Sequence, residues 1–298
     1  MSLENLITDH ATSEEGPLQV SFEFSPPKTD EAEANLWTAI RRLEPLQPSF
    51  VSVTYGAGGT TRERTHATVK RMVEETSLKP AAHLTCVGAS RGETDDILRA
   101  YWDAGIRHIV ALRGDMPGMS SPYQPHAQGY RTTPELIAGI RKIADFEVSV
   151  SFYPERHPDS PSHGHDIELL KAKMDAGASR ALGQFCFDND LTARFRDDAA
   201  AAGITIPVVP GVMPTTNFNG IARMAGKAGA SIPAWLAKAY EGLDEDVETR
   251  RIVGAAVLAD QVQQLRVRGF GQFHFYTLNQ ANLTYAACRI LGLRPSQL

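Results

Sequence analysis

The chain has 298 residues, of which 42% are hydrophobic and 22% are charged, as in a soluble globular protein with a sizeable core. Its formal net charge is -5 at pH 7, and Lys and Arg are scattered among Asp and Glu. The sequence therefore lacks the basic stripe that follows a nucleic-acid backbone, and we expect small-molecule partners instead.

Cysteine spacing and hydropathy indicate the cellular compartment and the relation to the membrane. Cys86, Cys186 and Cys288 form no CxxC pair, so neither a disulfide framework nor a zinc ribbon is indicated. The polar, acidic start does not resemble a secretory signal, and no run approaches the roughly 18 apolar residues of a membrane span. These features predict a cytoplasmic protein that stays out of the membrane.

Short β-rich runs alternate along the chain with longer runs whose apolar residues recur at helical spacing. The expected strands are 19–24, 50–55, 81–87, 108–114, 147–153, 180–187, 206–212 and 272–278. Several intervening segments end in a glycine just before the next strand, as at Gly105, Gly177 and Gly203, where a helix needs a positive φ to stop. This rhythm predicts parallel βαβ units that close an α/β fold of the (β/α)8 TIM-barrel type.

The spacing changes after the seventh expected strand, because residues 214–272 hold several helical stretches where one would suffice. We expect extra helices near the seventh and eighth strands. The division predicted is a polar N-terminal segment at 1–17, which need not be ordered, and a single catalytic barrel domain at 18–298. An open doubly wound sheet is the rival architecture, but the turn SPPKTDE after the first strand lacks the GxGxxG fingerprint.

Active sites of such barrels lie at the carboxyl ends of the strands, so polar residues there are the candidates. Glu23 lies inside the first expected strand and shares a face with Ser21. A carboxyl group in the barrel mouth or half buried would have a raised pKa, which suits a proton donor near neutral pH. A structural glutamate paired with an arginine explains the same residue equally well.

Other polar residues at strand ends leave two interpretations open. Asp115 follows Gly114, which would let the backbone approach a ligand, but the sequence RGD is also common in solvent-facing turns. Gln184 is an amide inside an apolar strand, where it needs a ligand or a backbone partner. The loop GAGGTT has no P-loop lysine, which favours a flexible loop.

Histidines and one lysine complete the candidates. His83 lies in the third expected strand, where a satisfied core histidine is the commoner case. His157, His163 and His165 lack the HExxH spacing, so we predict no metal site. Lys173 on the following helix could neutralise a phosphate, although most helical lysines are only solvated.

Taken together, these segments resemble the motifs of methylenetetrahydrofolate reductases of the short bacterial type. The resemblance covers about residues 18 to 293, with the motifs in the family's order and at its intervals. The segments that carry it are VSFEFSPPKT, FVSVTYGAGG, AHLTCVG, GIRHIVALRGDMP, SVSFYPERHPDS, KMDAGASRALGQFCFD, PGVMPTTNF, IPAWLAKAYEGLDED and FHFYTLNQA.

The resemblance implies reduction of 5,10-methylenetetrahydrofolate to 5-methyltetrahydrofolate, in one-carbon metabolism and methionine synthesis. Non-covalent FAD would carry hydride from NADH or NADPH in a ping-pong reaction. By position, Glu23 matches the general acid that protonates N10, and Asp115 matches the carboxylate beside flavin and pterin. Gln184 matches the amide that binds pterin and nicotinamide in turn. We also expect a homo-oligomer.

The resemblance also implies a set of FAD-binding residues. Thr54, which would also neighbour the nicotinamide, belongs to it, and Arg113 and Lys173 suit the pyrophosphate. The implied FAD shell is Thr54, Tyr55, Ala57, His83, Arg113, Gly114, Asp115, Tyr130, Tyr153, His157, Asp166 and Lys173.

Four positions depart from the family pattern on the folate side. Gln280, which matches a substrate-binding position, stands where the family usually has Arg. Met224 stands where many bacterial members carry an aromatic lid residue. Gly220 stands in place of a glutamine, and Ser25 stands in place of a phenylalanine. We expect the hydride chemistry to survive and folate binding to change. The alternatives are a demethylating paralogue, another flavin barrel such as a proline-dehydrogenase-like enzyme, and a non-catalytic binding subunit.

Overall fold

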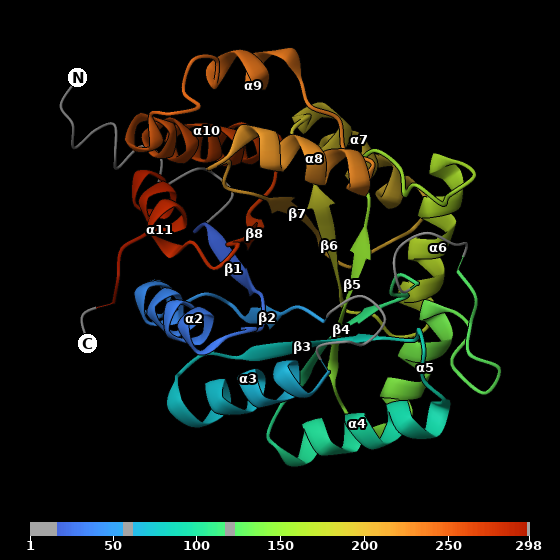
Figure 1. Cartoon of the computed structure of the whole chain (residues 1–298). Helices are drawn as coiled ribbons and strands as arrows, with labels where there is room; N and C mark the ends of the chain where they lie inside the picture. Colours follow the sequence, from blue (N-terminus) through green and yellow to red (C-terminus); the bar gives the residue numbers. More distant parts are fainter. Residues whose placement is uncertain (1–16, 56–61, 117–122, 297–298) are drawn as a thin grey trace.

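The computed structural model describes residues 17–55, 62–116 and 123–296, and its strands form one closed parallel barrel in the order β1 to β8 (Figure 1). The predicted (β/α)8 fold is therefore confirmed. The strands are β1 Gln19–Phe24, β2 Val51–Val53, β3 Pro80–Thr85, β4 His108–Leu112, β5 Glu147–Phe152, β6 Arg180–Phe185, β7 Val208–Val212 and β8 Gln272–Tyr276. Most of them end before the expected carboxyl end, because the chain leaves the sheet there to form loops.

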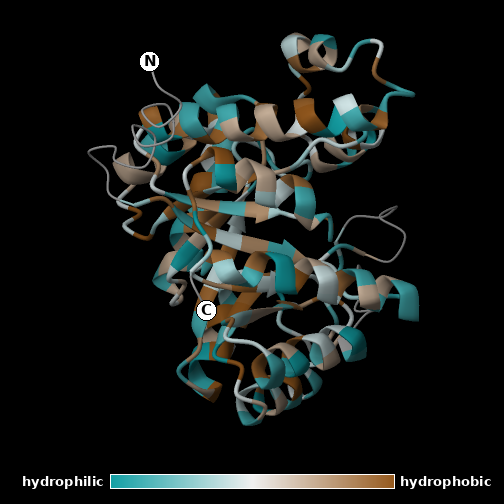
Figure 2. Ribbon diagram, turned by 90° about the vertical axis from the view of Figure 1, so that its left-hand side faces the viewer, coloured by the Kyte–Doolittle hydropathy of each residue, from teal (hydrophilic) through white to brown (hydrophobic). Residues whose placement is uncertain are grey.

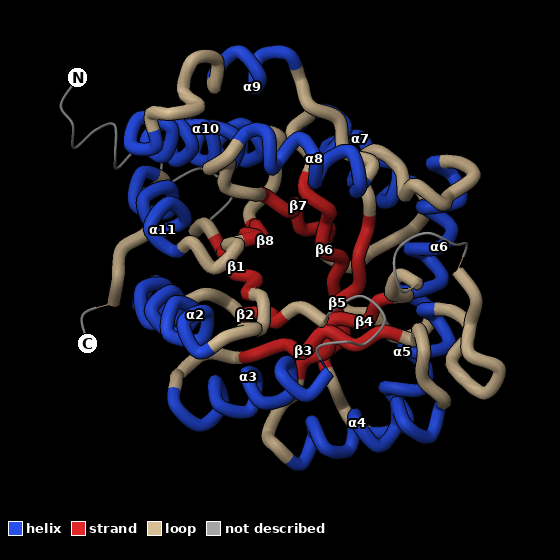
Figure 3. Tube along the Cα trace, viewed as in Figure 1, coloured by secondary structure: helices blue, strands red, loops and turns tan. Residues whose placement is uncertain are grey.

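Helices surround the strands as an outer ring (Figure 3). They are α2 Asp30–Leu43, α3 Arg62–Glu75, α4 Arg91–Asp103, α5 Thr133–Ile143, α6 His163–Asp175, α7 Asn189–Ala201, α8 Phe218–Ala228, α9 Ala234–Ala239, α10 Val247–Val267 and α11 Ala281–Ile290, with a short 3-10 turn η1 at Glu44–Leu46. In the part of the chain that the structure describes, no helix is long and apolar enough to cross a membrane.

Helix ends follow the signals in the sequence. Ser90 and Glu93 form a reciprocal capping box at the start of α4, which satisfies two backbone N–H groups that the helix leaves unpaired. Gly105, Gly177 and Gly203 follow α4, α6 and α7 with φ of 85°, 114° and 77°. These glycines stop each helix in the left-handed region, as the sequence predicts.

Successive side chains of β1 point alternately to the core outside the barrel and to the barrel interior. Phe22 and Phe24 point outward into the large core between the barrel and the helices. Ser21 and Glu23 occupy the opposite face of the strand, toward the barrel interior. Figure 2 shows hydrophobic and hydrophilic residues alternating around the helices, which pack their apolar faces on the barrel. The middle of the barrel is filled by a small cluster, namely Phe50, Ala81, Val110, Leu182 and Val209.

The decorated region after β7 is confirmed as three helices, α8, α9 and α10, before β8 begins. α8 and α9 pack on the end of β6 through an apolar cluster that includes Phe185, Ile221 and Leu236. The Tyr240 hydroxyl donates to the Thr215 carbonyl at 2.9 Å, which ties α9 to the chain that leaves β7. This cluster holds α8 beside the mouth of the barrel.

Candidate active site

A cavity of about 920 Å³ opens at the carboxyl ends of the strands. Its wall includes Glu23 from β1, His83 from β3 and Gln184 from β6, and Met224 and Lys227 reach it from α8. This volume lies near the upper end of the range for ligand pockets, so the cavity has room for a large organic ligand. The barrel therefore places its cavity where enzymes of this fold carry their active sites.

Most of the residues proposed from the sequence meet in this cavity. Its lining includes Glu23, Thr54, Tyr55, His83, Arg113, Gly114, Asp115, Tyr153, His157, Asp166, Lys173 and Gln184. Ala57 lies outside the described residues. Tyr130 and Gln280 are not part of the lining.

The position of Tyr130 explains its absence from the lining. Its ring packs against Gly139 of α5, and its hydroxyl donates to Asp95 of α4 at 2.7 Å. The side chain is therefore engaged between two helices, while the next residues, Arg131 and Thr132, do reach the cavity. Gln280 is exposed at the start of α11, with its backbone N–H bonded to the Thr277 carbonyl at 2.8 Å.

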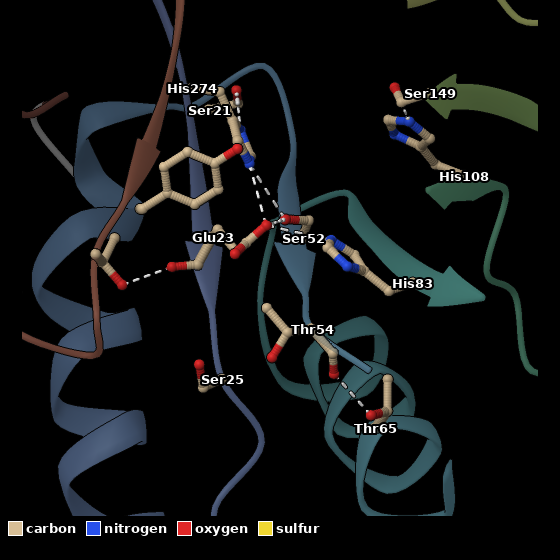
Figure 4. A network of polar contacts seen from close by, with 12 residues as sticks. Ser21, Glu23, Ser25, Ser52, Thr54, Thr65, His83, His108, Ser149 and His274 are labelled. Carbon is tan, nitrogen blue, oxygen red and sulfur yellow. Dashed lines mark hydrogen bonds and ion pairs between the residues drawn. The ribbon is translucent and has the colours of Figure 1, made fainter. Parts of the chain in front are cut away.

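Glu23 is the centre of a polar network in which residues of neighbouring strands meet (Figure 4). Its Oε2 lies 3.3 Å from His83 Nε2 of β3 and 3.5 Å from His274 Nε2 of β8. The Ser52 hydroxyl of β2 donates to the same oxygen at 3.4 Å. Ser21 lies behind them, with its hydroxyl 2.8 Å from His274 Nδ1. The three contacts of the carboxylate thus converge on Oε2.

The electrostatics of Glu23 correct one expectation. Burial raises its pKa, as the sequence suggests, but the hydrogen bonds and positive charge of His274 and His83 outweigh burial and lower the pKa to about 2. The carboxyl group is therefore ionised at neutral pH. His83 is one of the candidates that the sequence indicates, but its contact with Glu23 and the contribution of His274 depend on strands that are remote in the chain.

The backbone on either side of Glu23 is fixed by the turn that follows β8. Thr277 donates to the Glu23 carbonyl through its backbone N–H at 3.2 Å and its hydroxyl at 2.6 Å. The Asn279 side chain accepts from the Ser25 N–H and donates to the Ser25 carbonyl, both at 2.9 Å. Leu278 and Asn279 have φ of 50° and 56°, a costly conformation for residues with a Cβ, so these bonds hold a strained turn.

Gly114 shapes the opposite wall, where the chain leaves β4. Its φ is 81°, and a Cβ there would lie 2.6 Å from Val87 Cγ1 and 2.8 Å from Thr85 Cβ. Only glycine fits this turn, which brings Arg113 and Asp115 to the cavity. The close approach of the Gly114 backbone is thus to β3 and the residues after it.

Two cations lie on this side of the cavity. Arg113 Nη2 is 2.6 Å from Asp159 Oδ2, and this hydrogen bond lowers the pKa of Asp159. Lys173 is buried and donates to the Ser151 carbonyl at 2.7 Å. Burial lowers the pKa of Lys173 to about 8 although the Asp166 carboxylate opposes the shift, so the amine is still mostly protonated at pH 7. A fixed guanidinium and a buried ammonium suit an anionic ligand group.

Aromatic and amide groups complete this side. The Tyr153 and His157 rings meet edge to face, with centroids 4.5 Å apart. Burial raises the pKa of Tyr153, and Gln184 forms a hydrogen bond with the same side chain. The Gln184 Oε1 accepts from the Phe185 N–H at 3.0 Å. Its amide nitrogen is a donor that a bound ligand could use.

Three residues of the Glu23 network were missed as site residues by the sequence analysis, namely Ser21, Ser52 and His274. A usable signal was present, since each is a polar residue in the middle of an apolar strand. A buried polar side chain needs a hydrogen-bond partner, but the sequence does not show which strands are neighbours and can provide one. Among the residues the structure describes, no group of three or more His, Cys, Asp or Glu could hold a metal ion.

The fold and this site define a β/α-barrel enzyme with its active-site cavity at the carboxyl ends of the strands. Residues 7–292 match the sequence profile of the family described as Methylenetetrahydrofolate reductase. The chain belongs to this family, and it is an oxidoreductase.

Relatives in bacteria and plants agree with this assignment. The 5,10-methylenetetrahydrofolate reductases of Salmonella typhimurium and Escherichia coli K12 are each 47% identical to the chain, over 94% of it and 93% of their own length. A "Probable methylenetetrahydrofolate reductase (NADH)" of Oryza sativa is 33% identical over 94% of the chain and 49% of its own length.

A solved structure shares the fold at low sequence identity. It is an uncharacterised Clostridium thermocellum protein that binds two copies of 5-methyl-5,6,7,8-tetrahydrofolic acid. The TM-score is 0.62 at 11% identity, with 97% of this chain and 98% of that one covered. The likeness shows a common barrel architecture.

Proposed function

We propose that the chain reduces 5,10-methylenetetrahydrofolate to 5-methyltetrahydrofolate, with hydride from NADH or NADPH passing through bound FAD. Family membership and the names of the bacterial relatives support the folate reaction. The observation that carries the proposal is the Glu23 carboxylate, anchored through Oε2 beside a cavity of about 920 Å³. Opening the methylene bridge requires a proton at N10, and Glu23 can supply it once the bound ligand has raised the pKa of its carboxyl group and a proton has been taken up from solvent.

The cavity wall fits FAD in its charges and its shape. Arg113, Lys173 and His157 lie on one side, where they would hold the pyrophosphate. The Gly114 turn leaves no side chain between Arg113 and Asp115, and Tyr153 offers an aromatic face. Bound FAD would supply the hydride chemistry, accepting hydride from one ligand and delivering it to the next.

The residues of the chain account for the remaining tasks. Gln184 can donate and accept hydrogen bonds, so it can bind a nicotinamide amide and then a pterin in the same place. Thr54 borders the same cavity. One cavity that takes the two ligands in turn fits a ping-pong order. Glu23 and its two imidazoles would serve only the folate step, because hydride transfer from a nicotinamide needs no acid.

The decisive experiment compares the wild type with Glu23→Gln in the two half-reactions. We expect Glu23→Gln to leave flavin reduction by the dinucleotide within about twofold of the wild-type rate. We expect it to slow flavin reoxidation by 5,10-methylenetetrahydrofolate by roughly 10²-fold or more, the usual contribution of a general acid. Anaerobic stopped-flow absorbance of the FAD-loaded protein measures both rates.

Two results would contradict the proposal. If the purified wild type, after reconstitution, retained no FAD, the cofactor assignment would fail. If Glu23→Gln slowed both half-reactions equally, Glu23 would have a structural role and the proton would come from another group.

A further inference from the structure

We propose that His274 is a positioning residue for Glu23, holding Oε2 so that Oε1 is the oxygen that exchanges a proton with the bound ligand. The inference rests on the proposed function, because it assigns a task within the folate step. Its basis is the convergence of the imidazoles of His83 and His274 and the hydroxyl of Ser52 on one carboxylate oxygen (Figure 4).

The imidazole of His274 is held so that it cannot turn away from Glu23. Its side chain has no exposed surface, and Ser21 Oγ lies 2.8 Å from Nδ1. The ring is stacked on Phe50 with centroids 5.7 Å apart and an interplanar angle of 12°. A ring bonded at one nitrogen and stacked on one face presents Nε2 to the carboxylate in one orientation only.

The hydrogen bonds of Ser21 determine where the proton of His274 lies relative to Glu23. Ser21 can donate to Nδ1, or it can donate to the Phe273 carbonyl at 3.3 Å and accept from Nδ1. In either arrangement an ionised Glu23 needs a hydrogen on Nε2, since a bare nitrogen lone pair would face a negative oxygen. Ionisation of Glu23 and protonation of Nε2 are therefore coupled.

The two oxygens of the Glu23 carboxylate have different roles. Because Glu23 is ionised before the ligand binds, it must first take up a proton from solvent in the ligand complex. When Oε1 then gives this proton to the ligand, negative charge returns to the carboxylate. The Nε2–H group of His274 and the Ser52 hydroxyl then stabilise this charge through Oε2. Because both donors are already in place, little reorganisation accompanies the proton transfer.

The titratable groups around Glu23 come from three elements. His83 of β3 contacts Oε2, and His274 and Tyr276 lie on β8. The Tyr276 hydroxyl donates to the Gly183 carbonyl at 2.6 Å, and burial, together with the negative charge of Glu23, raises its pKa. Asp115 lines the cavity after β4. Of these groups, His274 is the one that is both fully buried and in contact with Oε2, and its Nε2 also lies 3.5 Å from Ser52 Oγ.

The test uses two substitutions that each keep half of the imidazole. His274→Asn places a polar group near Nδ1, so Ser21 keeps a partner while the contact with Glu23 is lost. His274→Gln reaches the position of Nε2 and restores a donor to Oε2. His108→Asn is the matched control, because His108 is another buried histidine, bonded to Ser149 at 2.7 Å and packed on the same Phe50 ring, and it lies outside the set of groups that contact Oε2.

We expect His274→Asn to slow the folate half-reaction by roughly tenfold or more, a part of the general-acid contribution, with flavin reduction unchanged within about twofold. His274→Gln should recover most of the loss, and His108→Asn should leave both rates near wild type. Carbon-13 NMR of glutamate-labelled protein, with the Glu23 signal assigned from Glu23→Gln, should show the Glu23 titration moving to higher pH in His274→Asn, because burial then prevails.

Three outcomes would overturn the proposal: equal slowing of both half-reactions in His274→Asn, no recovery in His274→Gln, or an unchanged Glu23 titration. If His274→Asn failed to fold, Ser21→Ala would replace it, since loss of the hydroxyl frees the ring and should shift the same titration in the same direction. If the wild type turned over no folate, the proposed function would fail, while the titration would still decide whether His274 holds Glu23.

Discussion

The Glu23 carboxylate shows how neighbouring strands set the properties of one side chain. Burial raises the pKa of the carboxyl group, but the imidazoles of His274 and His83 beside Oε2 outweigh burial and hold the pKa at about 2. A ligand that enters the cavity changes this balance, because it brings its own basic nitrogen and displaces water. The acid strength of Glu23 in the reaction is therefore a property of the whole cluster.

Lys173 leads to a prediction at the same scale. Burial lowers its pKa to about 8, so the charge that attracts an anionic ligand is lost as the pH rises through that value. We expect FAD to bind the apoprotein roughly tenfold more weakly at pH 9 than at pH 7, which corresponds to one charge-assisted hydrogen bond. Fluorescence titration with FAD measures the affinity.

The control for this prediction lies on the same helix. Lys173→Met should bind FAD weakly at both pH values, whereas Lys171→Met should behave like the wild type, because Lys171 is paired with Asp175 on the surface. If Lys173→Met kept the pH dependence of the wild type, another group would be responsible for it.

Gln280 carries a second residue-scale prediction. If an arginine at this position pairs with the anionic tail of folate, the neutral amide forfeits about 1.5–3 kcal/mol of binding. We expect Gln280→Arg to lower the KM for folate about tenfold without changing kcat, because the tail lies far from the reacting carbon. Steady-state kinetics at low and moderate salt provide the measurement.

The structure offers a rival for this contact. Lys227 of α8 lines the cavity, whereas Gln280 is exposed outside its lining. An unchanged KM in Gln280→Arg, together with a raised KM in Lys227→Gln, would assign the tail to Lys227 and refute the expectation for Gln280.

At the scale of elements, the turn between β8 and α11 connects the end of the chain to its beginning. Thr277 and Asn279 bond to the backbone of Glu23 and Ser25, while Leu278 and Asn279 adopt left-handed backbone angles. Non-glycine residues adopt such angles in succession only where the surroundings compensate for the cost. The turn therefore fixes the backbone that carries Glu23 relative to the barrel.

We expect Asn279→Ala to lower the free energy of unfolding by about 1–3 kcal/mol, because two backbone groups of Ser25 lose their partner and the strain remains. Urea denaturation followed by circular dichroism measures the change. Asn219→Ala is the control, since its amide makes one long surface contact with Asp244, at 3.4 Å. Equal stability of the two variants would mean that water replaces Asn279 at no cost.

At the scale of the whole molecule, barrel closure makes the first and last strands neighbours. The register pairs Ser21 with His274 and Glu23 with Tyr276, although about 250 residues separate them in the chain. Closure thus links the stability of the fold to the charge state of the site. The homo-oligomer expected from the family resemblance stays a prediction.

This link gives a prediction for acid stability. The pKa of Glu23 is about 2 in the folded protein against an ordinary value of 4.5, so its ionised form stabilises the fold above pH 4.5, and this contribution is lost as the pH falls from 4.5 toward 2. We expect the difference in unfolding free energy between the wild type and Glu23→Gln to shrink over this range by about 3 kcal/mol. Urea titrations at several pH values measure it, and parallel curves would contradict it.

Periodicity and glycine placement in the sequence determined the eight strands, the helices between them and the extra helices after β7. These features depend on local geometry, since a strand alternates every second residue and a helix stops at a left-handed glycine. The ordered motifs also identified the family, and most of the residues that they marked lie in the cavity lining. The low pKa of Glu23, the fixing of His274 by Ser21 and the exposure of Gln280 were decided only by the tertiary structure. Each depends on which strands or loops become neighbours and how deeply a side chain is buried, and barrel closure sets both.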